Sequence, residues 1–300
     1  MISVDGTSGN DNWFTSDVTV SLSSTDSVSE VDKTEYSFDN ISWNAYSTPL
    51  TIADEGVFSI YYRSIDEAGN METTKTETGK IDKTAPLGYV VINDDAAYTG
   101  SERVTLTLSA DDTISGVAQM CFSNDGTEWS NWEAYSTSKT WELSEGCGTK
   151  TVYVQFKDNT DLFLSTSQDR ITLDTINPTA NAGHNQTVTV DTPITFNASK
   201  SSDNIGIASY EWNFGDGSTG SGEEITYKYA KEGKYSVKLT VQDIVGNTDT
   251  TKITVTVVSE VDPLLLIGVA STATILILAS TWFIWKRKKT NLTVNHVSVC

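Results

Sequence analysis

Residues 1–178 of the 300-residue chain contain a long internal repeat. The segment VTVSLSSTDSVSEV, which begins at Val18, returns as VTLTLSADDTISGV from Val104, an offset of 86 residues. Self-similarity at a fixed period indicates that one folding unit is used more than once. Residues 1–86 and 87–178 are therefore predicted to be two copies of one domain.

A third unit is more diverged but keeps the same ending. In every unit an Asp lies 20 residues before a Pro and ten residues after a Gly. These residues are Gly56, Asp66 and Pro86, then Gly148, Asp158 and Pro178, then Gly233, Asp243 and Pro263. Agreement at two spacings in three places predicts a third domain, residues 179–262.

Each unit contains six or seven short runs of alternating apolar residues, such as TVYVQF (151–156) and YSVKLTV (235–241), between turns rich in Asp, Asn, Gly and Ser. A period of two is typical of strands with one buried face. Seven short strands in about 90 residues favour an antiparallel immunoglobulin-like sandwich. The predicted fold class is all-β: three tandem immunoglobulin-like β-sandwiches followed by one C-terminal transmembrane helix.

The third unit carries a specific motif, YEWNFGDG followed by YKYAKEGKYSVKLTVQD. Over residues 179–258 it closely resembles the polycystic-kidney-disease-type (PKD) domain. The matching positions are Trp212, Phe214, Gly215, Asp216, Gly217, Tyr227, Tyr229, Gly233, Tyr235, Val237, Leu239, Val241 and Asp243. The resemblance implies that the tryptophan is a core residue and that FGDG connects strands; direct ligand binding by the turn is the alternative.

Tyr235, two residues after Gly233, suggests the tyrosine corner of immunoglobulin-like folds. Phe58 and Lys150 stand at the corresponding positions of the other units. The hydroxyl bond of such a corner is therefore predicted in the third unit alone.

Units one and two are similar to bacterial and archaeal immunoglobulin-like repeats over residues 11–86 and 98–178, through TEYSFDN and the closing YRSIDEAGN and KIDKTAP. Domains of both kinds occur on prokaryotic surface proteins and as accessory modules of secreted hydrolases. The resemblance implies a prokaryotic surface protein, with an archaeal source favoured over a bacterial one, whose role is spacing, adhesion or display.

Residues 263–285 form an uncharged apolar run followed directly by Lys286, Arg287, Lys288 and Lys289. This length and flank predict a single transmembrane helix with a cytoplasmic tail, residues 286–300, and an extracellular N-terminal part. The opening MISVDGTSGN has neither the basic nor the apolar region of a signal peptide. We therefore expect the sequence to be part of a longer precursor, or a reading frame that lost its start.

The charge of the chain is uneven. Residues 1–262 hold all 40 acidic residues but only 16 of the 20 basic ones. Such an acidic surface repels phosphate backbones, so nucleic acid is excluded as a partner and cations are favoured. An extracellular protein or polysaccharide partner is left open.

The residue inventory argues against catalysis. The two histidines, His184 and His296, lie at a linker and in the tail, which leaves no basis for a Ser-His-Asp or Cys-His arrangement or a histidine zinc site. Slender sandwiches also offer little cleft for a pair of catalytic carboxylates. The chain is predicted not to be an enzyme.

Aspartates recur where calcium could bind. The loops after the second and penultimate strands of such a sandwich share one pole. This predicts three pairs, with linker aspartates joining the second and third: Asp26 with Asp66; Asp111 and Asp112 with Asp158, joined by Asp82; and Asp203 with Asp243, joined by Asp174. Oxygen ligands from several loops suit calcium; the alternative is that these side chains only cap turns.

Several further sites are candidates. Cys121 and Cys147 are predicted either to form a disulfide or to remain free thiols. Trp129 and Trp132, in TEWSNWEAY, are either a carbohydrate-stacking platform or packing residues. The sequons at Asn40, Asn185 and Asn197 predict glycosylation on the outer side.

The sequence as a whole favours a non-catalytic, membrane-anchored extracellular stalk or adhesion module. Two alternatives remain: the accessory C-terminal region of a surface hydrolase whose catalytic domain lies upstream, and a carbohydrate-binding module.

Overall fold

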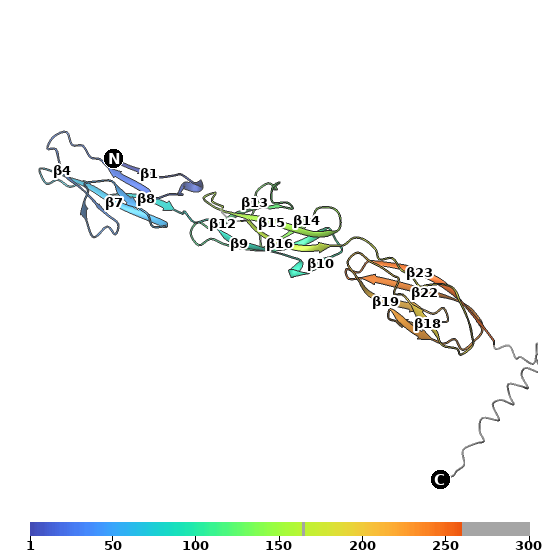
Figure 1. Ribbon diagram of the computed structural model, residues 1–300. Coiled ribbons are helices and arrows are strands. Elements are labelled where there is room, and N and C mark those ends of the chain that lie inside the picture. Colours follow the sequence, from blue (N-terminus) through green and yellow to red (C-terminus); the bar gives the residue numbers. More distant parts are fainter. Residues whose placement is uncertain (164–165, 260–300) are drawn as a thin grey trace, which may run out of the picture. The chain divides into compact units, whose positions relative to one another are not determined.

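The computed structural model describes residues 1–163 and 166–259. They form two compact units: Met1–Ile176 with Val245–Asn247, and Asn177–Ile244 with residues 248–259. The regular elements within the described residues are short strands and two single 3-10 turns (Figure 1). The prediction of an all-β fold is confirmed for this part of the chain.

The first sandwich has a three-stranded and a five-stranded sheet. The smaller sheet has the order β1 (Ile2–Asp5), β3 (Val18–Leu22), β6 (Leu50–Ile52), and the larger has the order β2 (Trp13–Phe14), β8 (Lys75–Ile81), β7 (Gly56–Asp66), β4 (Val31–Ser37), β5 (Asn44–Ala45). The turn η1 (Asn10–Asn12) precedes β2. The strand β2 runs parallel to β8, and all other pairs are antiparallel.

The second sandwich repeats this topology strand for strand. Its smaller sheet has the order β14 (Ser138–Glu142), β11 (Arg103–Asp111), β9 (Leu87–Ile92), and its larger sheet β10 (Tyr98–Thr99), β16 (Thr166–Leu173), β15 (Gly148–Asp158), β12 (Val117–Ser123), β13 (Glu133–Ala134). The turn η2 (Asn93–Asp95) matches η1. Each copy has eight strands rather than six or seven, because the two-residue strands are too short to show a period.

The second unit contains the third sandwich. Its five-stranded sheet has the order β17 (Gln186–Thr189), β23 (Thr248–Val258), β22 (Gly233–Asp243), β19 (Ile207–Asn213), β20 (Thr219–Ser221), and β18 (Ile194–Asn197) pairs with β21 (Glu224–Tyr227) in the other sheet. As in the other two sandwiches, one edge strand of the larger sheet runs parallel to its neighbour; here it is β17, which pairs with β23.

Each sandwich has a separate hydrophobic core. The alternating residues Val18, Val20 and Leu22 of β3 are buried, as are their repeat counterparts Val104, Leu106 and Leu108 of β11. The apolar side chains gather in three distinct clusters, one per sandwich. Period-two alternation therefore predicted the buried face correctly, because successive side chains of a strand point to opposite sides.

In each sandwich the penultimate strand ends at an equivalent aspartate. The strands β7, β15 and β22 each run for 11 residues from a glycine to an aspartate. Asp66, Asp158 and Asp243 each pair with the first residue of the neighbouring strand, just before an irregularity in the register. A bulge re-aims nearby side chains, so it places a terminal aspartate at one pole of each sandwich.

The FGDG stretch is a strand connection between β19 and β20. Trp212 is buried, and its indole Nε1 donates a hydrogen bond to the carbonyl of Gly222 at 3.0 Å. The Tyr229 hydroxyl donates to the Phe214 carbonyl at 2.9 Å, and the Tyr227 hydroxyl donates to Asp216 at 2.6 Å. These contacts tie the turn to its own sandwich, so FGDG acts as a fold element.

The predicted tyrosine corner is present. The Tyr235 hydroxyl donates to the Lys231 carbonyl at 2.9 Å. At the corresponding place in the first sandwich, the ring of Phe58 lies over Gly79, where an added Cβ would come 2.3 Å from it. Phe58 therefore packs over Gly79 in the first sandwich, whereas Tyr235 makes a hydrogen bond at the equivalent position of the third.

The predicted transmembrane helix, residues 263–285, and the predicted tail, residues 286–300, lie outside the described residues. Among the residues that are described, none of the helical segments has the length and apolar character needed to cross a bilayer.

Asp125, in the turn after β12, supports a pH prediction. Its Oδ1 accepts hydrogen bonds from the backbone N–H groups of Glu128 and Thr127, at 2.8 and 2.7 Å, and from the Ser123 hydroxyl at 2.9 Å. These bonds favour the carboxylate and hold the pKa of Asp125 well below its usual 3.8. Asp39 has the same surroundings and a pKa lowered for the same reason.

Since the folded pKa of Asp125 lies below the unfolded one, ionisation stabilises the fold above about pH 4, and this contribution is lost as the pH falls further. We therefore expect Asp125→Asn to be less stable than the wild type by a constant amount from about pH 7 to 5, with the gap closing below about pH 4. Thermal unfolding of both proteins across this range measures the gap. Asp39→Asn should follow the same curve, and a gap independent of pH would contradict the assignment.

Candidate metal site

Three predicted aspartates meet at the pole of the second sandwich. Asp82 directly follows β8, Asp112 directly follows β11, and Asp158 ends β15. One carboxylate oxygen of each lies within 4.8 Å of the others. Asp111, also predicted to take part, instead pairs with Leu87 inside the sheet and is exposed.

Backbone N–H groups hold each carboxylate in place. Asp112 Oδ1 accepts from Ile114, Ser115 and Gly116 at 2.8–3.1 Å. Asp82 Oδ1 accepts from Thr84 at 3.0 Å, and its Oδ2 accepts from Ser115 N–H at 3.1 Å. The loop after β11 therefore orients two of the three side chains at once.

Asp158 is the most constrained of the three. Its side chain is 1% exposed, and its Oδ1 accepts from Thr160 N–H and Oγ1, both at 2.7 Å, and from Leu162 N–H at 2.9 Å. Its Oδ2 is buried and has no hydrogen-bond partner. Burial, with a contribution from the charge of Asp82, raises the pKa of Asp158 above its usual value.

Basic side chains next to this cluster pair elsewhere. Lys83 forms an ion pair with Asp17, and Lys157 forms one with Asp161, both at 2.7 Å. Within residues 1–163 and 166–259, no Lys or Arg forms an ion pair with Asp82, Asp112 or Asp158. The negative charge of the cluster is therefore not neutralised by a basic side chain described in the structure.

Ser115 is a polar group of this site that the sequence prediction missed. Its N–H donates to both Asp82 and Asp112, and its hydroxyl oxygen is buried without a hydrogen-bond partner. The repeat contained a signal for it, because the offset of 86 residues carries Ser29 onto Ser115. Ser29 also sits between two aspartates, as its hydroxyl contacts both Asp26 and Asp66.

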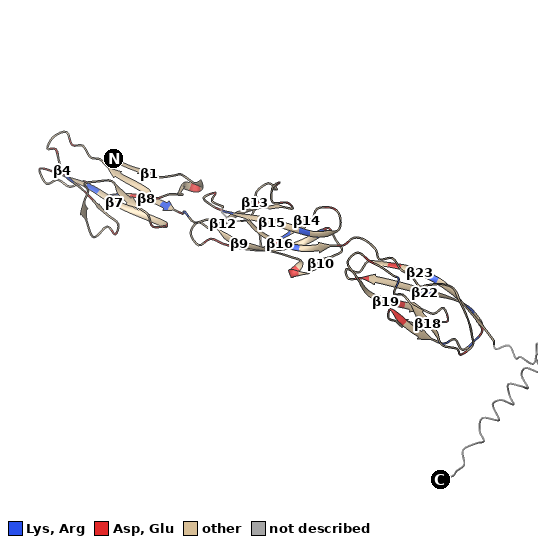
Figure 2. Cartoon of the chain, viewed as in Figure 1, with Lys and Arg blue, Asp and Glu red and all other residues tan. Residues whose placement is uncertain are grey.

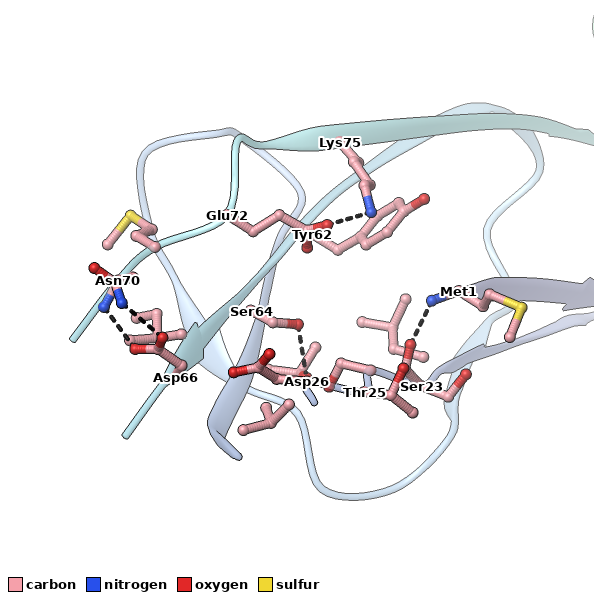
Figure 3. A pocket seen from close by; sticks show the side chains of 16 residues that line it. Met1, Ser23, Thr25, Asp26, Tyr62, Ser64, Asp66, Asn70, Glu72 and Lys75 are labelled. Carbon is pink, nitrogen blue, oxygen red and sulfur yellow. Dashed lines mark hydrogen bonds and ion pairs between the residues drawn. The ribbon is translucent and has the colours of Figure 1, made fainter. Parts of the chain in front are cut away.

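The corresponding pair in the first sandwich is already saturated by protein groups. Asp26 accepts from Ser29 and Val28, and Asp66 accepts from Asn70 N–H and Nδ2, both at 2.7 Å, and from Ser29. These bonds lower the pKa of both carboxylates. Both line a cavity of about 490 Å³, where Asn70 faces Asp66 and the ion pair between Glu72 and Lys75 forms another part of the wall (Figure 3). The structure brings Asp26 and Asp66 together but leaves their oxygens less available for a metal ion.

Similar local geometry surrounds the remaining predicted ligands. In the second unit, carboxylate oxygens of Asp203 and Asp243 lie within 4.8 Å of each other, and Asp203 Oδ2 accepts from Ile205 and Gly206 N–H at 2.8 Å. Asp174 belongs to the first unit, where its Oδ1 accepts from Ile176 N–H at 3.1 Å. Calcium binding by these residues stays a prediction.

The comparison with known proteins concerns the third sandwich. Residues 175–258 match the family model of the PKD domain. This confirms the resemblance read from the FGDG motif. The prokaryotic, and particularly archaeal, origin expected for the chain stays a prediction.

Relatives of the chain include a collagenase and a metalloprotease. It is 43% identical over 81 residues to collagenase ColA of Clostridium perfringens, covering 26% of this chain and 7% of ColA. It is 48% identical over 58 residues to the pre-pro-metalloprotease PrtV of Vibrio cholerae, covering 19% of this chain and 6% of PrtV. The solved PKD1 domain of V. cholerae PrtV is 36% identical with a TM-score of 0.23, covering 27% of this chain and 98% of that one. The chain thus spans less than a tenth of the length of these two curated relatives.

Of the two alternatives for Cys121 and Cys147, the structure has the free thiols rather than the disulfide. Cys121 lies within β12, opposite Gln155, while Cys147 comes just before β15 begins. Eight residues of extended chain separate Cys147 from Gln155, about 26 Å. Burial raises the pKa of the Cys121 thiol to about 11, so it behaves as a packing residue.

The two candidate sugar-binding tryptophans are both partly exposed. The ring of Trp132 packs against Phe163, with centroids 5.5 Å apart, and the Lys157 Nζ lies 4.7 Å from the Trp132 centroid. Protein groups thus occupy part of the surface that a sugar ring would need. Carbohydrate binding by Trp129 and Trp132 stays a prediction, and these contacts favour the packing alternative.

The three sequon asparagines are exposed. Asn40 lies in a turn of the first sandwich with a positive φ of 61°. In the PKD domain, Asn185 accepts from Thr254 N–H through Oδ1, and Asn197 donates through Nδ2 to Glu224 at 2.7 Å. Glycosylation modifies the Nδ2 atom, so at Asn197 it would require breaking the hydrogen bond to Glu224. Glycosylation of the three asparagines stays a prediction.

Lys and Arg lie at several places on the strands of both units, and Lys238 pairs with Lys252 across β22 and β23 (Figure 2). The expectation that nucleic acid is not a partner rests on the excess of acidic residues in 1–262, and it stays a prediction.

Proposed function

We propose that the chain is a non-catalytic accessory region of a larger extracellular hydrolase. The observation that carries the proposal is the PKD match at residues 175–258, together with 43–48% identity to short segments of a collagenase and a metalloprotease. PKD domains are accessory modules rather than catalytic ones. The repeat pair that precedes the PKD domain has the same sandwich architecture, which suits a series of modules that position another domain.

The features of the described residues support an accessory role. The contacts of FGDG, Trp212 and the tyrosine corner stabilise the sandwich itself. The cluster of Asp82, Asp112 and Asp158 holds its carboxylates with backbone N–H groups and buries two of them. Such buried oxygens suit a structural ion better than a substrate that must enter and leave.

The first test is the size of the native protein. Antibodies raised against this chain would capture the protein from its source, and mass spectrometry would give its intact mass and full peptide coverage. We expect a mass well above the 32.7 kDa of these 300 residues, with hydrolase sequence in the same polypeptide. A native polypeptide that consists of these residues alone would contradict the proposal.

A membrane-anchored stalk is a second and compatible proposal. It is supported by the uncharged run at residues 263–285 and the four basic residues that follow it. In this arrangement the β-sandwiches would be extracellular and residues 286–300 cytoplasmic. The captured protein should then remain in membranes washed with alkaline carbonate and be released by detergent; release by carbonate alone would argue against the anchor.

A further inference from the structure

We propose that Asp82, Asp112 and Asp158 form a calcium site that fixes the segment after β8 to the pole of the second sandwich. Two of the three ligands come from the second sandwich and the third from the segment that enters it. This inference does not depend on the proposed function.

The spacing of the three carboxylates suits one calcium ion. Calcium binds oxygen at about 2.4 Å, so two of its ligands are at most about 4.8 Å apart. The three oxygens satisfy this limit for every pair. They come from three separate places in the chain, as is common where a cation holds loops together.

The burial of Asp158 points to a missing partner. A carboxylate oxygen without a hydrogen bond is costly to bury, because its hydration is lost and nothing replaces it. Asp158 is 1% exposed and Asp82 fully buried, yet Oδ2 of Asp158 accepts no hydrogen bond and no basic side chain among the described residues pairs with either aspartate. A bound cation would satisfy the oxygen and offset the repulsion among the three charges.

The loop after β11 is already arranged for binding. Three N–H groups fix one oxygen of Asp112, and a fourth bond from Ser115 fixes Asp82. Second-shell bonds of this kind orient carboxylate ligands. The buried hydroxyl of Ser115 is a candidate for an additional oxygen ligand, because its own N–H contacts two of the three aspartates.

The site would join the segment after β8 to both of its neighbours. Lys83 and Thr84 contact Glu55 of the first sandwich, through Lys83 N–H at 2.6 Å and the Thr84 hydroxyl at 2.9 Å. Asp82, one residue earlier, accepts from Ser115 of the second sandwich. A cation bound by Asp82 would therefore restrain this segment beyond what one hydrogen bond provides.

Hydrogen exchange on the full 300-residue chain tests the site locally. The protein is dialysed against chelator, and exchange is compared with calcium chloride, with magnesium chloride and with neither. Calcium at about 1–10 mM, above the dissociation constants of about 0.1–1 mM of extracellular calcium modules, should slow exchange several-fold at the N–H groups of residues 114–116 and 160–162. Magnesium demands shorter, octahedral geometry and should have much less effect.

Two variants remove a ligand charge while keeping the structural oxygen. Asp158→Asn and Asp112→Asn retain an Oδ1 acceptor but lose the carboxylate, and each should need at least about tenfold more calcium for half-maximal protection. Asp66→Asn makes the same change at the repeat counterpart of Asp158 and should leave protection at 114–116 and 160–162 unchanged. Asp112 is only partly buried, so its variant keeps the test valid if Asp158→Asn does not fold.

Three results would overturn the proposal: no calcium-dependent protection of the wild type at these N–H groups, unchanged calcium dependence in a folded Asp158→Asn or Asp112→Asn variant, or equal protection by magnesium.

Discussion

Trp212→Ala is expected to destabilise the PKD domain by about 3–5 kcal/mol. The indole is 1% exposed and packs in the centre of the third core, with its ring centroid 5.4 Å from that of Phe196. The change leaves a large cavity and removes the Nε1 hydrogen bond to Gly222. Domains of this size are stable by roughly 5–15 kcal/mol, so the variant should lose a large part of the folding free energy of the second unit.

Hydrogen exchange of the β22 and β23 amides measures this loss within the full chain, without assuming that all sandwiches unfold together. Val258→Ala is the control, because Val258 is 39% exposed at the end of β23 and should change the free energy by less than about 1 kcal/mol. A decrease of less than about 1 kcal/mol in the free energy of unfolding of Trp212→Ala would show that packing of the indole contributes little to the stability of this core.

Gly215→Ala is expected to lower the free energy of unfolding of the second unit by at least about 2 kcal/mol, because the FGDG turn has no room for a side chain at this position. Gly215 has a φ of +84°, and an added Cβ would lie 2.7 Å from the backbone oxygen of Ser236. Backbone cannot move aside as a flexible side chain can. The variant is therefore destabilised both by the positive φ of the turn and by the steric clash with β22.

Gly217→Ala is the matched control in the same turn. Its φ is +99°, but an added Cβ meets nothing within 4 Å, so only the conformational cost of about 1 kcal/mol applies. Exchange of the β22 amides compares the two variants. Equal losses would mean that the turn is held by backbone conformation alone, with no close approach of β22.

The disulfide shows one limit of prediction from the sequence. Pairing of Cys121 with Cys147 depends on the register of β12 on β15, which is set by contacts between residues 30 or more positions apart. Strand periodicity gives the direction of each side chain but not which residue of the neighbouring strand lies opposite. In the observed register Cys121 lies opposite Gln155, eight residues along the chain from Cys147, so the two sulfur atoms are too far apart to bond.

The aspartates show a different limit. The repeat correctly placed Asp66 and Asp158 at equivalent strand ends, but the two differ in what surrounds them. Asn70 satisfies both oxygens of Asp66, whereas Oδ2 of Asp158 is buried without a partner. Equivalent positions in a repeat therefore share a backbone while differing in chemistry.

The sequence by itself determined the all-β class, the repeated unit, the buried face of each strand and the PKD motif, because alternation and repeats are local patterns along the chain. Only the tertiary structure decided which carboxylates are available to a cation. Asp82 receives a hydrogen bond from Ser115, 33 residues away, and Asp158 loses solvent on one oxygen when the sandwich closes over it. Burial and hydrogen-bond satisfaction depend on segments that meet only when the chain folds.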